Sequence, residues 1–173
     1  PTQTTTMNKF AERSLQVLNA GGSSDISEAW SIHHLSNHLN VTGCNFEMEI
    51  DYWCDYKIMD YMLITEDENI GVSVVRALCK SDELFSHDDG IRLLYNKING
   101  LIISRRSVIK KFTFFKSIIH IWSPDNYVTN VLINCLNSGE LNMEQMGVVG
   151  LLDIWITESA CDSIFHNGTG RSY

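Results

Sequence analysis

The spacing at which apolar residues repeat changes several times along the chain, and the order of these changes constrains the fold more than any other feature. In the range 86–103, Ile91, Leu94 and Ile98 repeat at the period of an amphipathic helix. In the range 45–52, apolar and acidic residues alternate, as in a strand with one buried face. The periods predict the order helix, helix, three strands, helix, strand, helix, strand. The expected ranges are 7–18, 24–40, 45–52, 57–65, 70–78, 86–103, 114–122, 123–137 and 148–157.

This order predicts an α/β fold with a single central mixed β-sheet of about five strands, flanked by helices. The helix 86–103 is expected to pack across the sheet. A length of 173 residues suits one domain. We expect an N-terminal helix and linker over residues 1–22, followed by a single domain over residues 23–173.

Charged residues are distributed unevenly along the chain, whose net charge is -8. Between Arg76 and Lys116, nine basic residues stand against four acids, which gives this segment +5 and leaves -13 for the remainder. A basic face of this kind can dock a phosphate backbone, and a solvated Lys-rich surface is the alternative. The candidate nucleic-acid-binding residues are Arg105, Arg106, Lys110 and Lys111.

Several classes of protein are disfavoured. The sequence has no Gly-rich phosphate loop, nucleophile elbow or dinucleotide fingerprint, so nucleotide hydrolysis is not expected. Its longest apolar runs, such as 101–103, are far shorter than the roughly 20 residues of a membrane helix, so no membrane is expected. The five widely spaced cysteines and the absence of a visible secretory signal predict a nuclear or cytoplasmic location.

The order of three strands followed by a helix, a strand, a helix and a strand resembles the core of restriction-endonuclease-like nucleases of the PD-(D/E)xK superfamily. Several blocks of the chain are also similar to blocks of a eukaryotic family of tRNA-intron-endonuclease-like proteins. These blocks are 21–29, 47–50, 60–61, 71–77 and 120–122. The resemblance implies a restriction-endonuclease-like fold in which acids converge on one or two Mg²⁺ or Mn²⁺ ions, because such ions polarise the phosphate and activate water.

In the superfamily, one acid comes from the helix before the sheet, a second from the second strand, and a Glu-x-Lys pair from the third. Glu28 and Asp60 match the first two positions, whereas Ser73 and Val75 stand where the third-strand pair is expected. Arg76 is basic, but adjacent strand residues point to opposite faces, so it cannot simply replace the lysine. The resemblance implies Glu28 and Asp60 as metal ligands. With Glu49 as a third ligand, the predicted catalytic residues are Glu28, Glu49, Asp60, Ser73 and Arg76.

Because the third strand lacks the Glu-x-Lys pair, another acid would have to supply the metal ligand and another basic residue the cation. Glu49, expected on the first strand, could supply the missing ligand. The missing cation could come from Lys57, Lys97 or Arg92.

Each acid also has a structural interpretation. Glu28 follows Asp25 by three residues, which is the spacing of a capping box. The acids of 47–51 could be the solvated face of an outer strand. An acid such as Asp60 inside an apolar strand is costly unless it is ligated or paired, and Arg76 could be its partner in a buried pair.

Histidine offers a second chemistry, since metal-free RNA cleavage needs a base near the 2′-hydroxyl. His120 lies in an apolar strand, where a core role with a hydrogen-bonded ring is the alternative. His34 and His38 share a helical face, but no Cys or acid at a fixed spacing completes a zinc site.

The function expected from the sequence is that of a nucleic-acid phosphodiesterase, an endonuclease acting on structured RNA or DNA, with tRNA processing as the role that the resemblance implies. The alternative is a catalytically degenerate protein of the same fold, serving as a nucleic-acid-binding or protein-interaction scaffold subunit. A homodimer and a larger protein complex both remain open.

Overall fold

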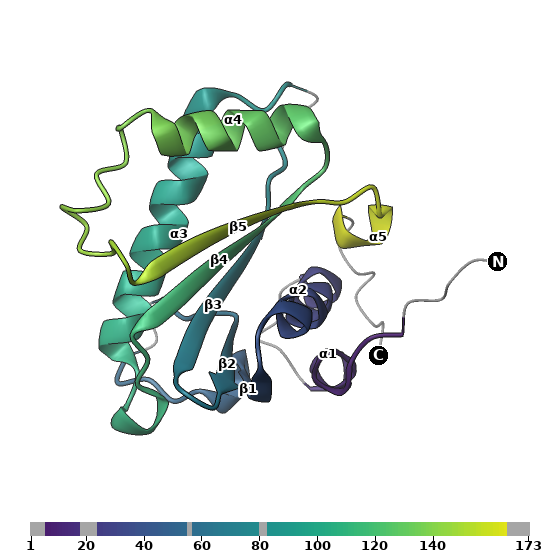
Figure 1. Cartoon of the computed structure of the whole chain (residues 1–173), viewed down its shortest axis with the longest axis vertical. Coiled ribbons are helices and arrows are strands. Elements are labelled where there is room, and N and C mark those ends of the chain that lie inside the picture. The colour runs from purple at the N-terminus through teal and green to yellow at the C-terminus, as the bar shows by residue number, and fades with distance from the viewer. Residues whose placement is uncertain (1–5, 18–23, 55–56, 80–82, 166–173) are drawn as a thin grey trace.

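The structure is a computed structural model that describes residues 6–17, 24–54, 57–79 and 83–165. A five-stranded sheet with the strand order β1-β2-β3-β4-β5 runs through its centre (Figure 1). β1 (Val41–Phe46), β2 (Tyr61–Thr65) and β3 (Asn69–Arg76) form an antiparallel meander. β4 (Lys116–Ser123) is parallel to β3, and β5 (Leu152–Glu158) is parallel to β4.

Helices lie on both sides of the sheet (Figure 1). α1 (Lys9–Ser14), α2 (Asp25–His38) and α5 (Asp162–Phe165) lie on one side, and α3 (His87–Ser107) and α4 (Asn126–Asn137) on the other. α3 and α4 provide the crossovers that the parallel pairs β3–β4 and β4–β5 require. The predicted fold class, a single mixed sheet of five strands flanked by helices, is confirmed.

Each side of the sheet has its own apolar core. Towards α2, the core includes Ile32 and Leu35 of the helix and Val72 of β3. Towards α3 and α4, it includes Ile98 of α3 and Ile119 of β4. Burial on both sides explains why β3 and β4 are almost continuously apolar, as strands covered on both faces are.

α3 follows its sequence pattern closely. The Ser86 side chain accepts a hydrogen bond from the Asp89 amide, and the Asp89 carboxylate accepts one from the Ser86 amide, which closes a capping box. Leu94, Ile98 and Leu101 form its buried stripe. Among the helices in the described part of the chain, none is long and apolar enough to cross a membrane.

The prediction of a strand over 45–52 is wrong. β1 ends at Phe46, and Glu47–Glu49 form a single 3₁₀ turn. The turn is closed by the Glu49 carboxylate, which accepts a hydrogen bond from the Phe46 amide at 3.1 Å. Alternating apolar and acidic residues are thus compatible with a turn when a local side chain takes over the backbone hydrogen bond.

The ends of other strands and helices also differ from the predicted ones. The strand expected from residue 57 begins at Tyr61, because the preceding backbone bonds to side chains: the Lys57 carbonyl accepts from the Ser104 hydroxyl, and the Met59 amide donates to the Tyr52 hydroxyl. The last strand begins at residue 152 rather than 148. Within the expected helix 7–18 the structure contains α1, and residues 18–22 of the expected helix and linker lie outside the described residues.

Candidate functional site

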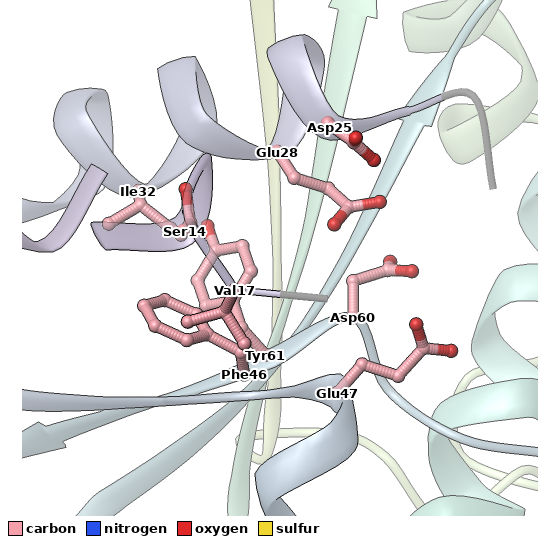
Figure 2. Close-up of a pocket in the computed structure, with 9 residues that line it drawn as sticks. All are labelled: Ser14, Val17, Asp25, Glu28, Ile32, Phe46, Glu47, Asp60 and Tyr61. Carbon is pink, nitrogen blue, oxygen red and sulfur yellow. The ribbon is translucent and has the colours of Figure 1, made fainter. Parts of the chain in front are cut away.

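A small cavity lies where the first turn of α2 approaches the start of β2. Its volume is about 20 Å³, which is enough for one water molecule. Figure 2 shows Glu28, Glu47 and Asp60 with their carboxylates gathered on one side of it. The lining residues, which we call the carboxylate pocket, are Ser14, Val17, Asp25, Glu28, Ile32, Phe46, Glu47, Asp60 and Tyr61.

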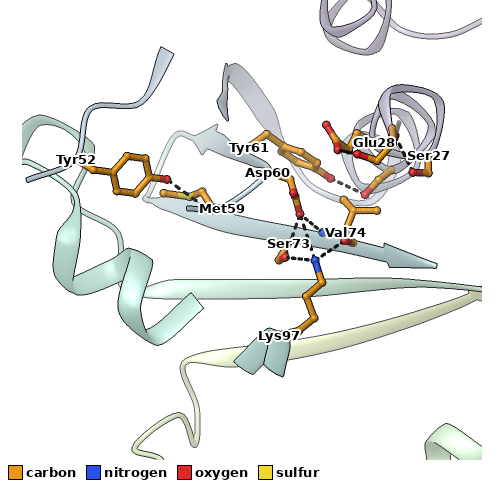
Figure 3. A network of polar contacts seen from close by, with 11 residues as sticks. Ser27, Glu28, Tyr52, Met59, Asp60, Tyr61, Ser73, Val74 and Lys97 are labelled. Carbon is orange, nitrogen blue, oxygen red and sulfur yellow. Dashed lines mark hydrogen bonds and ion pairs between the residues drawn. The ribbon is translucent and has the colours of Figure 1, made fainter. Parts of the chain in front are cut away.

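Asp60 directly precedes β2 and is held by groups of β3 and α3. Its carboxylate accepts hydrogen bonds from the Val74 amide at 2.5 Å and from the Ser73 hydroxyl at 3.0 Å. The Lys97 ammonium, from the middle of α3, lies 4.0 Å from the same carboxylate. It also donates to the Ser73 hydroxyl oxygen at 3.1 Å and to the Val74 carbonyl at 2.9 Å (Figure 3). Among the three cations considered from the sequence, Lys97 is the one the structure places beside Asp60.

The two predicted catalytic residues of the third strand face opposite ways. Ser73 faces α3, where it contacts Lys97 and Asp60. Arg76 donates a hydrogen bond to the Phe165 carbonyl of α5 at 3.4 Å, on the other side of the sheet. The structure therefore brings Ser73 into the Asp60 group, as the odd spacing between Ser73 and Arg76 on a strand allows.

Glu28 reaches the pocket from the first turn of α2. Burial and, next in size, the negative charge of Asp60 raise the pKa of its carboxyl to about 7; Glu47 and Asp25 add to this rise, and a hydrogen bond from the Ser24 hydroxyl opposes it. The charge of Asp60 is thus one of the causes that disfavour the ionised form of Glu28. A cation between them would relieve this repulsion.

Glu49, the third predicted metal ligand, contacts other groups instead of lining the carboxylate pocket. Its carboxylate forms an ion pair with Arg13 of α1 and accepts the Phe46 amide. Glu47 lines the carboxylate pocket instead. On a strand, Glu47 and Glu49 would share a face, because residues two apart point the same way. On a 3₁₀ turn each residue is rotated by about 120° from the one before, so the two side chains point in different directions. The prediction of a strand therefore did not distinguish Glu47 from Glu49.

The predicted nucleic-acid-binding residues lie at the far end of α3. Arg105 and Arg106 are in its last turn, and Lys110 and Lys111 belong to a 3₁₀ turn, Lys110–Phe112. Arg106, Lys110 and Lys111 are exposed. Eight residues separate Lys97 from Arg105, about 12 Å along the helix axis.

His120 lies behind the pocket in a chain of hydrogen bonds. The Tyr61 hydroxyl is 2.6 Å from the Ser31 hydroxyl, which is 2.6 Å from Nδ1 of His120. Nε2 of His120 is 3.0 Å from the Thr157 hydroxyl, which is 3.4 Å from Nε2 of His34. Burial, with the nearby His34, lowers the pKa of His120 to about 3, so the ring is neutral at pH 7. A fully buried ring with both nitrogens hydrogen-bonded matches the core role considered from the sequence.

In the described part of the chain, no three His, Cys, Asp or Glu side chains are grouped so that they could hold a metal ion. A pair of carboxylates is a different kind of site. Mg²⁺ commonly binds through one or two carboxylates and completes its shell with water and substrate phosphate. Glu28 and Asp60 both line one small cavity and are carboxylates of the kind that such a site uses.

Fold and site together describe a mixed α/β domain with a carboxyl pair and a lysine at the start of its second strand. Over 134 residues, the chain is 32% identical to the AAC-rich mRNA clone AAC4 protein of Dictyostelium discoideum. The match covers 73% of this chain and 20% of that protein, so the chain spans about one fifth of the length of the relative it matches. No family model matches the chain, and no solved structure matches it.

Proposed function

We propose that this domain is a metal-dependent nucleic-acid phosphodiesterase acting on structured RNA or DNA. The observation that supports the proposal is the position of Asp60, between Glu28 of α2 on one side and Ser73 and Lys97 on the other. Asp60 is thus the group common to two contacts: it lines the carboxylate pocket with Glu28, an acid from the helix before the sheet, and it lies 4.0 Å from the lysine of α3. These are the groups that phosphodiester cleavage with a divalent ion uses.

In this proposal, Glu28 and Asp60 hold Mg²⁺ or Mn²⁺. When bound, such an ion would polarise the phosphate and lower the pKa of a coordinated water. Lys97 replaces the lysine that the third strand lacks, since its ammonium is fixed by the Val74 carbonyl and the Ser73 hydroxyl. From there it can stabilise the negative charge that develops on the phosphate oxygens.

The Asp60 side chain also supports a second candidate function. The Val74 amide and the Ser73 hydroxyl already occupy one oxygen of its carboxylate, and Ser73 stands where the superfamily has an acid. A carboxylate with such partners can serve purely to join β2, β3 and α3. On that basis, the alternative is a catalytically degenerate subunit that binds nucleic acid or a protein partner.

Cleavage assays separate the two functions. The purified protein is incubated with labelled tRNA precursors, single-stranded DNA and branched DNA in the presence of Mg²⁺, Mn²⁺ or EDTA. We expect cleavage with a divalent ion that falls about 100-fold or more in Asp60→Asn and Lys97→Gln, the order of effect seen when a group that stabilises the transition state is removed. Glu49→Gln, the same chemical change outside the pocket, is expected to remain active.

Two results would decide against the proposal. Cleavage that persists in EDTA would remove the metal from it. Cleavage under no condition, by a protein that still binds nucleic acid, would favour the degenerate subunit.

A further inference from the structure

Two large aromatic side chains are exposed near the C-terminal end of α3. Trp53 is 78% exposed and Phe115 is 68% exposed. Exposed rings of this size offer flat apolar faces that another molecule can cover. The backbone at both residues is bonded to the end of α3, which carries the basic residue Arg105 and is followed by Lys110 and Lys111. We call these five residues the aromatic–basic surface.

Backbone contacts connect the members of this surface. The Trp53 amide donates to the Ser107 carbonyl at 2.7 Å, and the Ile109 amide donates to the Asp51 carbonyl at 3.1 Å. These bonds attach the segment that carries Trp53 to the end of α3 and to the residue preceding Lys110. The exposed ring of Trp53 therefore stands on a fixed backbone.

Phe115 is also attached to the C-terminal end of α3, through its backbone carbonyl. A guanidinium nitrogen of Arg105 is 3.4 Å from the Phe115 carbonyl. The preceding residue, Phe114, is 1% exposed and anchors the chain just before β4 begins. The backbone of Trp53 is thus bonded to the chain just before the turn Lys110–Phe112, and Phe115 follows that turn by three residues.

The charge of the aromatic–basic surface is positive. Lys110 and Lys111 are exposed in their turn, and Lys57 adds a further exposed cation, since its carbonyl accepts from the Ser104 hydroxyl of the last α3 turns at 3.0 Å. Lys116 is excluded from the surface because it pairs with Glu68 at 3.0 Å. Cations attract a phosphate backbone, and exposed rings provide faces on which unpaired bases stack. Duplex bases are already stacked on one another, so only a single strand uses both features.

The chain between this surface and the carboxylate pocket is short. Residues 57–60 run from the end of α3 to Asp60, whose amide donates to the Val72 carbonyl at 3.0 Å. On α3, Ser104 and Lys97 are seven residues apart, about 10 Å along the axis. That distance corresponds to about three stacked nucleotides at ~3.4 Å each.

We propose that the aromatic–basic surface binds a single-stranded segment of nucleic acid, with bases stacked on Trp53 and Phe115 and phosphates held by Arg105, Lys110 and Lys111. The segment is oriented so that its continuation reaches Asp60. Only this orientation rests on the proposed phosphodiesterase function; the binding itself does not require cleavage.

Fluorescence anisotropy tests the proposal with the full chain in EDTA, so that binding is measured without metal-dependent cleavage. The probes are labelled single strands of DNA and of RNA and a duplex of the same sequence. We expect single strands of at least one sugar type to bind more tightly than the duplex. Trp53→Ala and Phe115→Ala should each weaken single-strand binding about 5- to 150-fold, which corresponds to the stacking of one base.

Three matched variants identify the contacts. Trp53→Phe retains a ring and should restore most of the affinity lost in Trp53→Ala. Tyr127→Ala removes a ring that is 49% exposed on α4, and should leave binding unchanged. Replacing Lys110 and Lys111 together by Gln should lower the log–log salt slope on single strands by about 1.4, at ~0.7 per phosphate contact. Lys9→Gln, on α1, should not alter the slope.

Tighter duplex than single-strand binding, or full affinity in both Trp53→Ala and Phe115→Ala, would overturn the proposal. So would the absence of binding to every probe. If single strands bind as expected but no divalent ion supports their cleavage, the phosphodiesterase function fails while the single-strand surface stands.

Discussion

Replacing Glu28 by Gln should stabilise the protein at alkaline pH and should do so progressively less as the pH falls. The pKa of the Glu28 carboxyl is raised from 4.5 to about 7 in the folded protein, chiefly by burial and by the charge of Asp60. A carboxyl group whose pKa is higher in the folded state binds its proton more tightly there, so its contribution favours folding below pH 4.5. That contribution is lost as the pH rises from 4.5 through 7.

The size of the effect follows from the difference in pKa. Each pKa unit corresponds to 1.36 kcal/mol, so the ionised Glu28 costs the folded state at most about 3 kcal/mol at pH 8. Gln has a similar shape, keeps an oxygen that can accept from the Ser24 hydroxyl, and carries no charge. The free energy of unfolding of Glu28→Gln, relative to that of the unmodified protein, should therefore rise by about 1 to 3 kcal/mol between pH 4.5 and pH 8.

Urea denaturation, followed by tryptophan fluorescence at several pH values between 4.5 and 8.5, measures this difference. Glu49→Gln is the matched control, because it makes the same chemical change at an ion pair outside the pocket and should show no such rise. Parallel stability curves for Glu28→Gln and the unmodified protein, or a variant that loses stability at pH 8 relative to pH 4.5, would refute the reasoning. Either result would mean that burial and the neighbouring acids do not raise the pKa of Glu28 in the folded protein.

Millimolar Mn²⁺ or Mg²⁺ should raise the melting temperature of the unmodified protein, because an ion that binds only the folded state stabilises it, and Asp60→Asn should abolish the rise in differential scanning fluorimetry. An equal rise in this variant would place the ion elsewhere. His120 has a pKa of about 3 when folded against 6.5 when unfolded, so stability should fall by up to about 1.4 kcal/mol for each pH unit below 6.5, and circular dichroism in acid should show a shallower loss for His120→Phe. Gly71→Ala should destabilise by about 1 to 3 kcal/mol, because its Cβ would lie 2.4 Å from a ring carbon of Phe114. Gly100→Ala, which meets nothing within 4 Å on α3, should instead stabilise by about 0.5 to 1 kcal/mol in the same urea assay, and equal effects at the two glycines would contradict both predictions.

Local sequence patterns predicted a helix or strand correctly where the contacts that stabilise the element come from residues close by in the sequence. The capping box at Ser86 and the stripe Leu94, Ile98 and Leu101 predicted α3, since both depend on neighbours within a few residues. The apolar segments of β3 and β4 predicted strands because both faces of each are buried. The same reasoning failed at residues 45–52, where the Glu49 side chain takes the hydrogen bond of the Phe46 amide and turns the chain.

The sequence by itself singled out Asp60 as a costly acid in an apolar segment, Glu28 through a family resemblance, and Lys97 as one of three available cations. It could not show that Ser73, Lys97 and Asp60 meet, because they come from three elements and their contact depends on how α3 lies across β3. The period of a helix or strand shows which of its faces is apolar, because every residue on the buried face tends to be apolar. Which two polar residues then come within 4 Å depends on the docking of one element on another, and that is decided only by the tertiary structure.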